Sequence, residues 1–179
     1  RAAIIVPEGI IFQSATAYKA LRKLLVDKNY LYGVVSLPAG IFQPYSGVKT
    51  SILLLDRNLA KKTNNVLFVK IENDGFGLGA QRRELSTSDL PDAINLITQY
   101  NSAIRNDNFS SLDLDNLPLN SLVIDKTLIA GNGDYALSAD RYIQITNSKQ
   151  SKYELVELSE ICELYQPQTI SASEFKENG

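Results

Sequence analysis

Two observations predict an α/β fold and indicate that this chain forms the second half of its sheet: the order of strands and helix in the first part of the chain, and the later strands that follow one another directly. Residues 1–71 alternate apolar strand-like runs with one amphipathic helix, in the order strand, helix, strand, loop, strand, turn, strand. A crossover through a helix implies parallel strands in a sheet that helices cover. The later strands follow one another without a helix, so we expect antiparallel pairing at a sheet edge.

The first expected strand is Ala2–Val6, a continuous apolar run that ends at Pro7-Glu8-Gly9. Such a run is typical of a strand buried on both faces. Ser14 is a candidate N-cap for the helix that follows. This helix has apolar residues at helical spacing, namely Ala17, Leu21, Leu24 and Leu25. We expect its basic residues, Lys19, Arg22 and Lys23, to form its exposed face.

Three further strands are expected in this part, at Leu31–Leu37, Lys49–Asp56 and Val66–Ile71. Glycine and polar residues then dominate until Asp89-Leu90-Pro91-Asp92, where acidic residues and a proline predict the start of a helix. Ser121–Asp125 is expected to be a short strand followed by a helical turn, and Tyr142–Ile145 has a strand-like composition. Asp134 and Tyr135 with Arg141 and Tyr142 are a candidate packing cluster with a local ion pair.

The composition of the chain excludes several classes of catalytic and metal site. The chain has 179 residues, a net charge of −2, no histidine, no methionine and one cysteine. The absence of histidine excludes Ser–His and Cys–His nucleophile pairs and histidine-ligated metal sites. The single cysteine, Cys162, allows no intrachain disulfide, so we expect a reducing cytoplasm and a small buried apolar residue at this position. Any nucleic-acid contact must come from a local basic patch, since the chain as a whole is not basic.

No apolar run approaches the length of a membrane span, so no membrane partner is expected. The chain opens directly on a strand, with Arg1-Ala2-Ala3, and it contains no methionine. We therefore expect it to be a piece of a longer protein, with the first half of the sheet upstream.

The strongest candidate site is the loop that leads from Ile41 into the strand at Lys49. A loop at a strand end is where α/β enzymes hold groups that contact substrate. Phe42, Tyr45, Lys49 and Thr50 offer a ring, a phenol, an ammonium and a hydroxyl. Phe42 could instead be a core residue, but the Pro-Tyr-Ser-Gly sequence after Gln43 is typical of a loop. No group suited to proton transfer at neutral pH is present, so we expect a binding loop.

A second candidate is Gly75-Phe76-Gly77-Leu78-Gly79-Ala80, which fits a dinucleotide-binding pattern after a strand. That mechanism needs a helix N-terminus directly after the glycines. Residues 81–88 are a poor helix candidate, so a flexible glycine loop is preferred and a self-contained nucleotide-binding enzyme is the weaker alternative. Arg82 and Arg83 could contact phosphates, but on the sequence alone two solvated arginines are the preferred interpretation.

Four segments together resemble the C-terminal half of the modification (methyltransferase) subunit of type I restriction–modification systems, an adenine-N6 DNA methyltransferase family. They are Arg1–Gly9, Leu37–Leu53, Asp74-Gly75-Phe76 with Arg82-Arg83, and Asp134-Tyr135-Ala136-Leu137-Ser138 with Arg141-Tyr142. The resemblance covers residues 1 to about 145. Residues 153–179 are similar to the opening of a target-recognition domain of a specificity subunit, through Leu155–Glu163.

The resemblance implies a partial Rossmann-like S-adenosylmethionine-dependent methyltransferase sheet. Its expected divisions are 1–72 for the second half of the α/β core, 73–147 for a C-terminal extension, and 148–179 for a linker and the start of a specificity region. The implied enzyme flips an adenine out of duplex DNA and methylates its N6. Phe42 would pack against the flipped base, Tyr45, Lys49 and Thr50 would shape the pocket, and Arg82 and Arg83 would contact the DNA backbone.

The family's glycine-rich cofactor loop and its Asn/Asp-Pro-Pro-Tyr/Phe loop should lie upstream, and no Pro-Pro pair occurs in this chain. We therefore expect no catalytic, cofactor-binding or metal residues here, S-adenosylmethionine as cofactor of the full-length enzyme only, and an inactive fragment. Double-stranded DNA, a specificity subunit or fused specificity region, and a restriction subunit are the expected partners. As an alternative, residues 73–179 are a module that docks the specificity subunit without touching the base.

Overall fold

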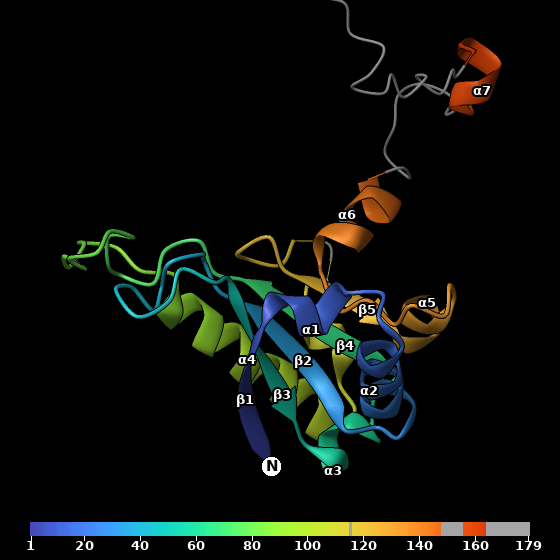
Figure 1. The fold of residues 1–179 in the computed structure, drawn as a ribbon. Coiled ribbons are helices and arrows are strands. Elements are labelled where there is room, and N and C mark those ends of the chain that lie inside the picture. Colours follow the sequence, from blue (N-terminus) through green and yellow to red (C-terminus); the bar gives the residue numbers. More distant parts are fainter. Residues whose placement is uncertain (115, 148–155, 164–179) are drawn as a thin grey trace, which may run out of the picture. The chain divides into compact units, whose positions relative to one another are not determined.

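The computed structural model describes residues 1–114, 116–147 and 156–163, and a mixed sheet organises its larger part (Figure 1). Residues Arg1–Ile145 form one compact unit and Thr146–Gly179 a second. In the second unit the described residues contain a short helix, α7 (Leu158–Ile161). No helix among the described residues is long and apolar enough to cross a membrane.

Five strands form the sheet, in the order β1-β3-β2-β4-β5. Their bounds are β1 (Ala2–Pro7), β2 (Leu31–Ser36), β3 (Thr50–Leu55), β4 (Asn65–Lys70) and β5 (Leu122–Asp125). β3 pairs antiparallel with both β1 and β2, β2 pairs parallel with β4, and β4 pairs antiparallel with β5. β1, β2 and β4 therefore point the same way, and their carboxyl ends share one edge of the sheet.

Helices cover both faces of this sheet (Figure 1). Their bounds are α1 (Glu8–Phe12), α2 (Thr16–Asp27), α3 (Arg57–Ala60), α4 (Leu90–Arg105), the 3-10 helix η1 (Phe109–Ser111), α5 (Lys126–Ala130) and α6 (Asp140–Asn147). One core cluster joins Val34 and Phe68 of the sheet to Ile11 and Val26 of α1 and α2. The other joins Val35 and Leu67 to α4, through residues such as Tyr100.

The central strands and α4 are confirmed as the sequence predicts them. β2 and β4 are almost continuously buried because both of their faces carry helices, which explains their unbroken apolar runs. α4 starts next to Pro91 and carries Asp92 in its first turn, as the local pattern indicates. The short strand β5 and the helix α5 after it are confirmed as well.

The expectation that the first strand is buried on both faces is wrong. β1 lies at the edge of the sheet, and Ala2–Ile5 are exposed, with Ile4 at 45 % and Ile5 at 53 %. β1 and β2 run parallel, as the crossover predicts, but β3 inserts between them. An apolar run shows that a strand is suited to burial. Whether its side chains are buried depends on the strands and helices that pack beside it, and the described residues place none at the outer side of β1.

The predicted faces of α2 are also wrong. The helix begins at Thr16, its N-cap is Ala15, and no side chain caps it, so Ser14 has no capping role. Arg22, expected on the surface, is fully buried, whereas Leu21 and Leu24 are 39 % and 48 % exposed. Burial of a charge is tolerated here because hydrogen bonds to backbone carbonyls surround the guanidinium.

Two smaller expectations fail and one holds. Tyr142–Ile145 belongs to helix α6 rather than to a strand, and Cys162 is exposed rather than buried. In α6 the tyrosine ring packs into the core and its hydroxyl donates to the Ala136 carbonyl, a contact that composition alone does not reveal. The ion pair between Arg141 and Asp134 is confirmed at 3.4 Å.

Candidate nucleic-acid interface

Two loops leave the sheet at the edge where β1, β2 and β4 end. We name residues 37–49 the Phe42 loop and residues 71–89 the Gly75 loop. They extend together from this edge in Figure 1, the first in light blue and the second in green. Ligands of open α/β sheets bind outside the carboxyl ends of the strands, so this pair of loops is the natural place for a site.

The Phe42 loop contains a tight, hydrogen-bonded turn. The Phe42 carbonyl accepts the amides of Tyr45 at 2.9 Å and Ser46 at 3.0 Å. The Gly40 carbonyl accepts the amide of Gln43 at 3.0 Å, and Gly40 has φ +84°, a conformation that favours glycine. The two aromatic side chains are therefore carried on an ordered turn.

The aromatic rings of this turn are available to a ligand. Phe42 is 38 % exposed and Tyr45 is 95 % exposed, so neither belongs to the core. Aromatic rings on an ordered surface are suited to stacking on nucleobases, because every base presents a π face.

Lys49 is the last residue of the Phe42 loop and Thr50 is the first residue of β3, and their environments differ. The Lys49 ammonium pairs with the Glu8 carboxylate at 2.6 Å, and the Glu8 amide donates to the Lys49 carbonyl at 3.0 Å. Lys49 is thus tied to the first residue of α1, directly after β1, and is only partly exposed. Thr50 is the first residue of β3, is 8 % exposed, and its Oγ1 has no hydrogen-bond partner among the described residues.

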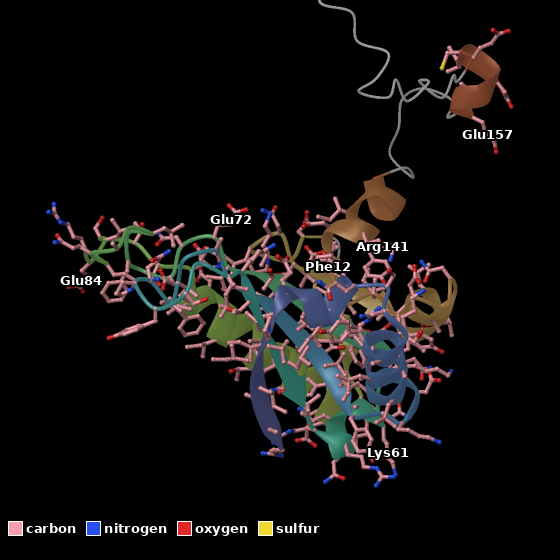
Figure 2. All side chains as sticks on the ribbon, viewed as in Figure 1. Phe12, Lys61, Glu72, Glu84, Arg141 and Glu157 are labelled. Atoms are coloured by element: carbon pink, nitrogen blue, oxygen red, sulfur yellow. The ribbon has the colours of Figure 1, made fainter. Side chains whose placement is uncertain are left out.

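Arg82 and Arg83 have different environments in the Gly75 loop. Arg82 pairs with Asp74, and the two side chains are 16 % and 8 % exposed. Arg82 also donates through Nη1 to the Ile41 carbonyl, so the interpretation of two solvated arginines is wrong for this residue. Arg83 is exposed. In Figure 2 the neighbouring Glu84 lies near the far end of this loop, and Glu72 lies near its base.

The Gly75 loop does not form the nucleotide-binding arrangement that its glycines allow. Residues 80–89 contain no helix, and the next helix, α4, begins at Leu90. The helix N-terminus that would receive a pyrophosphate is therefore missing from this segment. The alternative of a self-contained nucleotide-binding enzyme loses its structural basis.

A small pocket lies beside α1 at the carboxyl ends of β2 and β4, and neither of the two aromatic rings lines it. Ile11, Ser36, Phe68, Lys70 and Ser138 are among its lining residues. It has room for about one water molecule, so it cannot hold a base. Phe42, Tyr45 and Lys49 do not line it, and they present an open surface instead.

Sequence reasoning missed the partners that hold the two loops. Glu8 pairs with Lys49, and Asp74 pairs with Arg82. The sequence shows only that each pair consists of an acidic and a basic residue. That two such residues lie close together becomes clear only when the order of the strands in the sheet is known.

Comparison with known proteins supplies the family. Residues 1–151 match the family described as N-6 DNA Methylase. The methylase subunit of the type I restriction enzyme MpnII from Mycoplasma pneumoniae is 29 % identical over 154 residues, which are 86 % of this chain and 24 % of that protein. The EcoEI methylase subunit from Escherichia coli is 39 % identical over 62 residues, 35 % of this chain and 12 % of that protein. The chain spans at most about a quarter of these two relatives, by the same coverage figures.

Two solved structures share the fold. The methyltransferase subunit of a type I restriction–modification system from Streptococcus thermophilus is similar with a TM-score of 0.50 and 26 % identity, over 78 % of this chain and 25 % of that one. A chain from a structure on assembly and conformational transition of the type I system gives a TM-score of 0.52 at 20 % identity, over 83 % of this chain and 32 % of that one. The mixed sheet therefore corresponds to part of a methyltransferase fold of the Rossmann-like kind.

Proposed function

Because this chain belongs to the N-6 DNA methylase family, we propose that it is the C-terminal portion of a type I modification subunit and forms one wall of the target-adenine pocket. The observation that carries the proposal is the ordered turn that presents Phe42 and Tyr45 at the carboxyl edge of the sheet. Enzymes that modify a base must extrude it and stack it against aromatic or apolar side chains. The turn provides such a surface and provides no acid or base for the chemical step.

In this proposal Phe42 packs against the flipped adenine. Tyr45 contacts a neighbouring part of the DNA, and Lys49 and Thr50 shape the pocket from its floor. The Lys49–Glu8 ion pair supports a shaping role, since it fixes the lysine at the start of α1. The backbone contact is proposed for Arg82 and Arg83, and Arg83 is better placed for it because its side chain is exposed.

The opposite wall of the pocket is proposed to lie in another part of the protein. Two features support this. The relatives are several times longer than this chain, and the outer edge of β1 has no strand beside it among the described residues while Ile4 and Ile5 are exposed. Apolar edge strands are normally paired or covered. The missing wall would supply the S-adenosylmethionine loop and the Asn/Asp-Pro-Pro-Tyr/Phe loop.

This arrangement makes the portion inactive by itself. We expect it not to bind S-adenosylmethionine, which isothermal titration calorimetry tests directly. Micromolar binding by the isolated chain would contradict the division of the pocket between two parts. In the complete enzyme, double-stranded DNA and a specificity subunit or fused specificity region are the proposed partners, with a restriction subunit as a further one and the cytoplasm as the proposed location.

A second candidate function is a docking module for the specificity subunit, without contact to the base. It is favoured by the exposed apolar side chains of the Gly75 loop, since Phe76, Leu78 and Leu85 are 43 %, 49 % and 47 % exposed. Such side chains on one loop suit a protein partner as well as DNA.

The variant Phe42→Ala in the complete enzyme separates the two candidates. The pocket proposal predicts that methylation falls at least about tenfold, the loss of one stacking contact, while assembly with the specificity subunit is unchanged. The docking proposal predicts that Phe42→Ala leaves assembly with the specificity subunit unchanged and lowers methylation little. It predicts instead that Leu78→Ala, which removes an exposed apolar side chain from the Gly75 loop, weakens assembly.

A further inference from the structure

Three side chains of the Gly75 loop form a cluster against the backbone of the Phe42 loop. They are Asp74, Phe76 and Arg82. Asp74 pairs with Arg82, and the Arg82 guanidinium lies 5.6 Å from the centre of the Phe76 ring. The Asp74 carboxylate also accepts the Phe76 amide at 3.3 Å, which orients it within its own loop. The cluster therefore fixes the direction of the guanidinium.

The free side of that guanidinium faces the residues just before Phe42. Arg82 Nη1 donates to the Ile41 carbonyl at 2.5 Å and lies 3.4 Å from the Gly40 carbonyl. The Gly40 carbonyl also accepts the Gln43 amide that starts the turn. Arg82 thus holds the backbone at the root of the turn that carries Phe42 and Tyr45.

The two loops fit closely at this point. A side-chain carbon placed on Gly40 would lie 3.4 Å from the Leu78 carbonyl oxygen, and Gly40 already has a positive φ. The backbone of the Gly75 loop therefore lies directly against that of the Phe42 loop.

The Gly75 loop is itself well anchored. The Asp89 carboxylate, at the start of α4, accepts the amides of Glu72 and Asn73 at 2.9 and 2.8 Å. Backbone bonds close the loop, with the Leu85 amide donating to the Gly75 carbonyl and the Gly77 amide to the Arg83 carbonyl, each at 2.8 Å. These hydrogen bonds tie the Gly75 loop to the start of α4 and to itself, so the backbone that carries Arg82 is held at both ends.

We propose that Arg82 is a positioning residue, which together with Asp74 and Phe76 holds the Phe42 turn in the geometry that receives the base. The functional half of this inference rests on the proposed role of Phe42. The planar guanidinium serves the carboxylate through Nη2 and the carbonyls through Nη1 at the same time. A lysine ammonium has the charge but not the rigid fork, so it cannot hold both partners in this geometry.

Hydrogen–deuterium exchange of the 179-residue chain tests the positioning. The relevant amides are those of Gln43, Tyr45 and Ser46, which bond within the turn. In Arg82→Lys and in Asp74→Asn we expect these amides to exchange about tenfold faster, while the amides of β2 and β3 keep their protection. Arg83→Lys, the neighbouring exposed arginine, is the matched control and should leave the turn unchanged. Unchanged exchange in both Arg82→Lys and Asp74→Asn would overturn the inference.

Kinetics of the complete methyltransferase test the functional half. Arg82→Lys keeps the positive charge that a contact to the DNA backbone needs, so the KM for DNA should change little, and kcat should fall about tenfold because the defect is in the placement of the base. Arg105→Lys, an exposed arginine in the last turn of α4 and outside both loops, is the control and should leave kcat unchanged. A loosened turn with unaltered kcat would refute the base-pocket proposal and leave the structural positioning intact. A turn that stays protected would refute the positioning and leave the base-pocket proposal standing.

Discussion

Arg22 offers the sharpest prediction about the stability of the fold. Its side chain is fully buried in α2 and makes five hydrogen bonds to four backbone carbonyls. Two acceptors, Ile10 and Gln13, lie in and after α1, and the other two, Asp134 and Tyr135, lie in a turn more than a hundred residues later. Burial lowers the pKa of the guanidinium, but an arginine keeps its charge in proteins. Arg22 therefore links the backbone of residues 10–13 to the backbone of residues 134–135 through one guanidinium group.

The magnitude follows from these contacts. Arg22→Met keeps most of the side-chain volume but leaves four carbonyls without their donor. A buried acceptor that loses its partner costs about 1–3 kcal/mol, although carbonyls near the surface regain water. We therefore expect a loss of about 3–5 kcal/mol, the sum over four acceptors of which some regain water. This is a large part of the roughly 5–15 kcal/mol that stabilises a typical domain.

Urea denaturation followed by far-UV circular dichroism measures this loss. With a slope of about 2 kcal/mol/M, the midpoint of Arg22→Met should fall by roughly 2 M. Arg22→Lys should be intermediate, because an ammonium cannot span both segments. The exposed Lys61→Ala is the control and should change stability by less than about 0.5 kcal/mol. A loss below about 1 kcal/mol in Arg22→Met would refute the reasoning.

Three further predictions concern other parts of the chain. Tyr45→Ala should leave the urea midpoint unchanged, since the ring is 95 % exposed. It should weaken DNA binding by the complete enzyme about fivefold or more in an electrophoretic or anisotropy assay. Equal affinity would exclude a stacking contact. The hydrogen bond from Lys19 lowers the pKa of Asp134 below its ordinary 3.8. This carboxylate therefore contributes stability that is present above about pH 4 and is lost as the pH falls through its lowered pKa in the folded state. Asp134→Asn should remove that part of the loss of stability in acid, and an identical dependence of the unfolding free energy on pH would contradict it. We expect the isolated chain to self-associate in sedimentation experiments through the exposed apolar edge strand β1 and Ile5→Lys to reduce this association; a monomeric parent chain, or association unchanged by the substitution, would contradict this role of the β1 edge.

Local signals explain what the sequence predicts correctly. The apolar runs of β2, β3 and β4 and the acid–proline start of α4 are determined by neighbouring residues, so they can be recognised without the rest of the fold. The loop character of Phe42 and Tyr45 follows in the same way from the proline and glycine beside them.

The errors come from contacts between distant segments. The burial of Arg22 depends on carbonyls of Asp134 and Tyr135, and nothing within α2 indicates that they will be there. The exposure of β1 depends on which strand lies at its outer side. The pairing of Arg82 with Asp74 and with the Ile41 carbonyl depends on two loops meeting at the same sheet edge. In each case a charge or an apolar run has more than one possible partner, and the tertiary fold selects among them.

The central claim is that the Phe42 loop contacts the flipped target base, and photocrosslinking tests it most directly. A duplex with a photoreactive halogenated base in place of the target adenine is bound to the complete enzyme, irradiated and mapped by mass spectrometry. The account predicts a crosslink within residues 41–49, on Phe42 or Tyr45, that is lost when Phe42 is replaced by alanine. Efficient crosslinking that maps wholly outside this loop would contradict it.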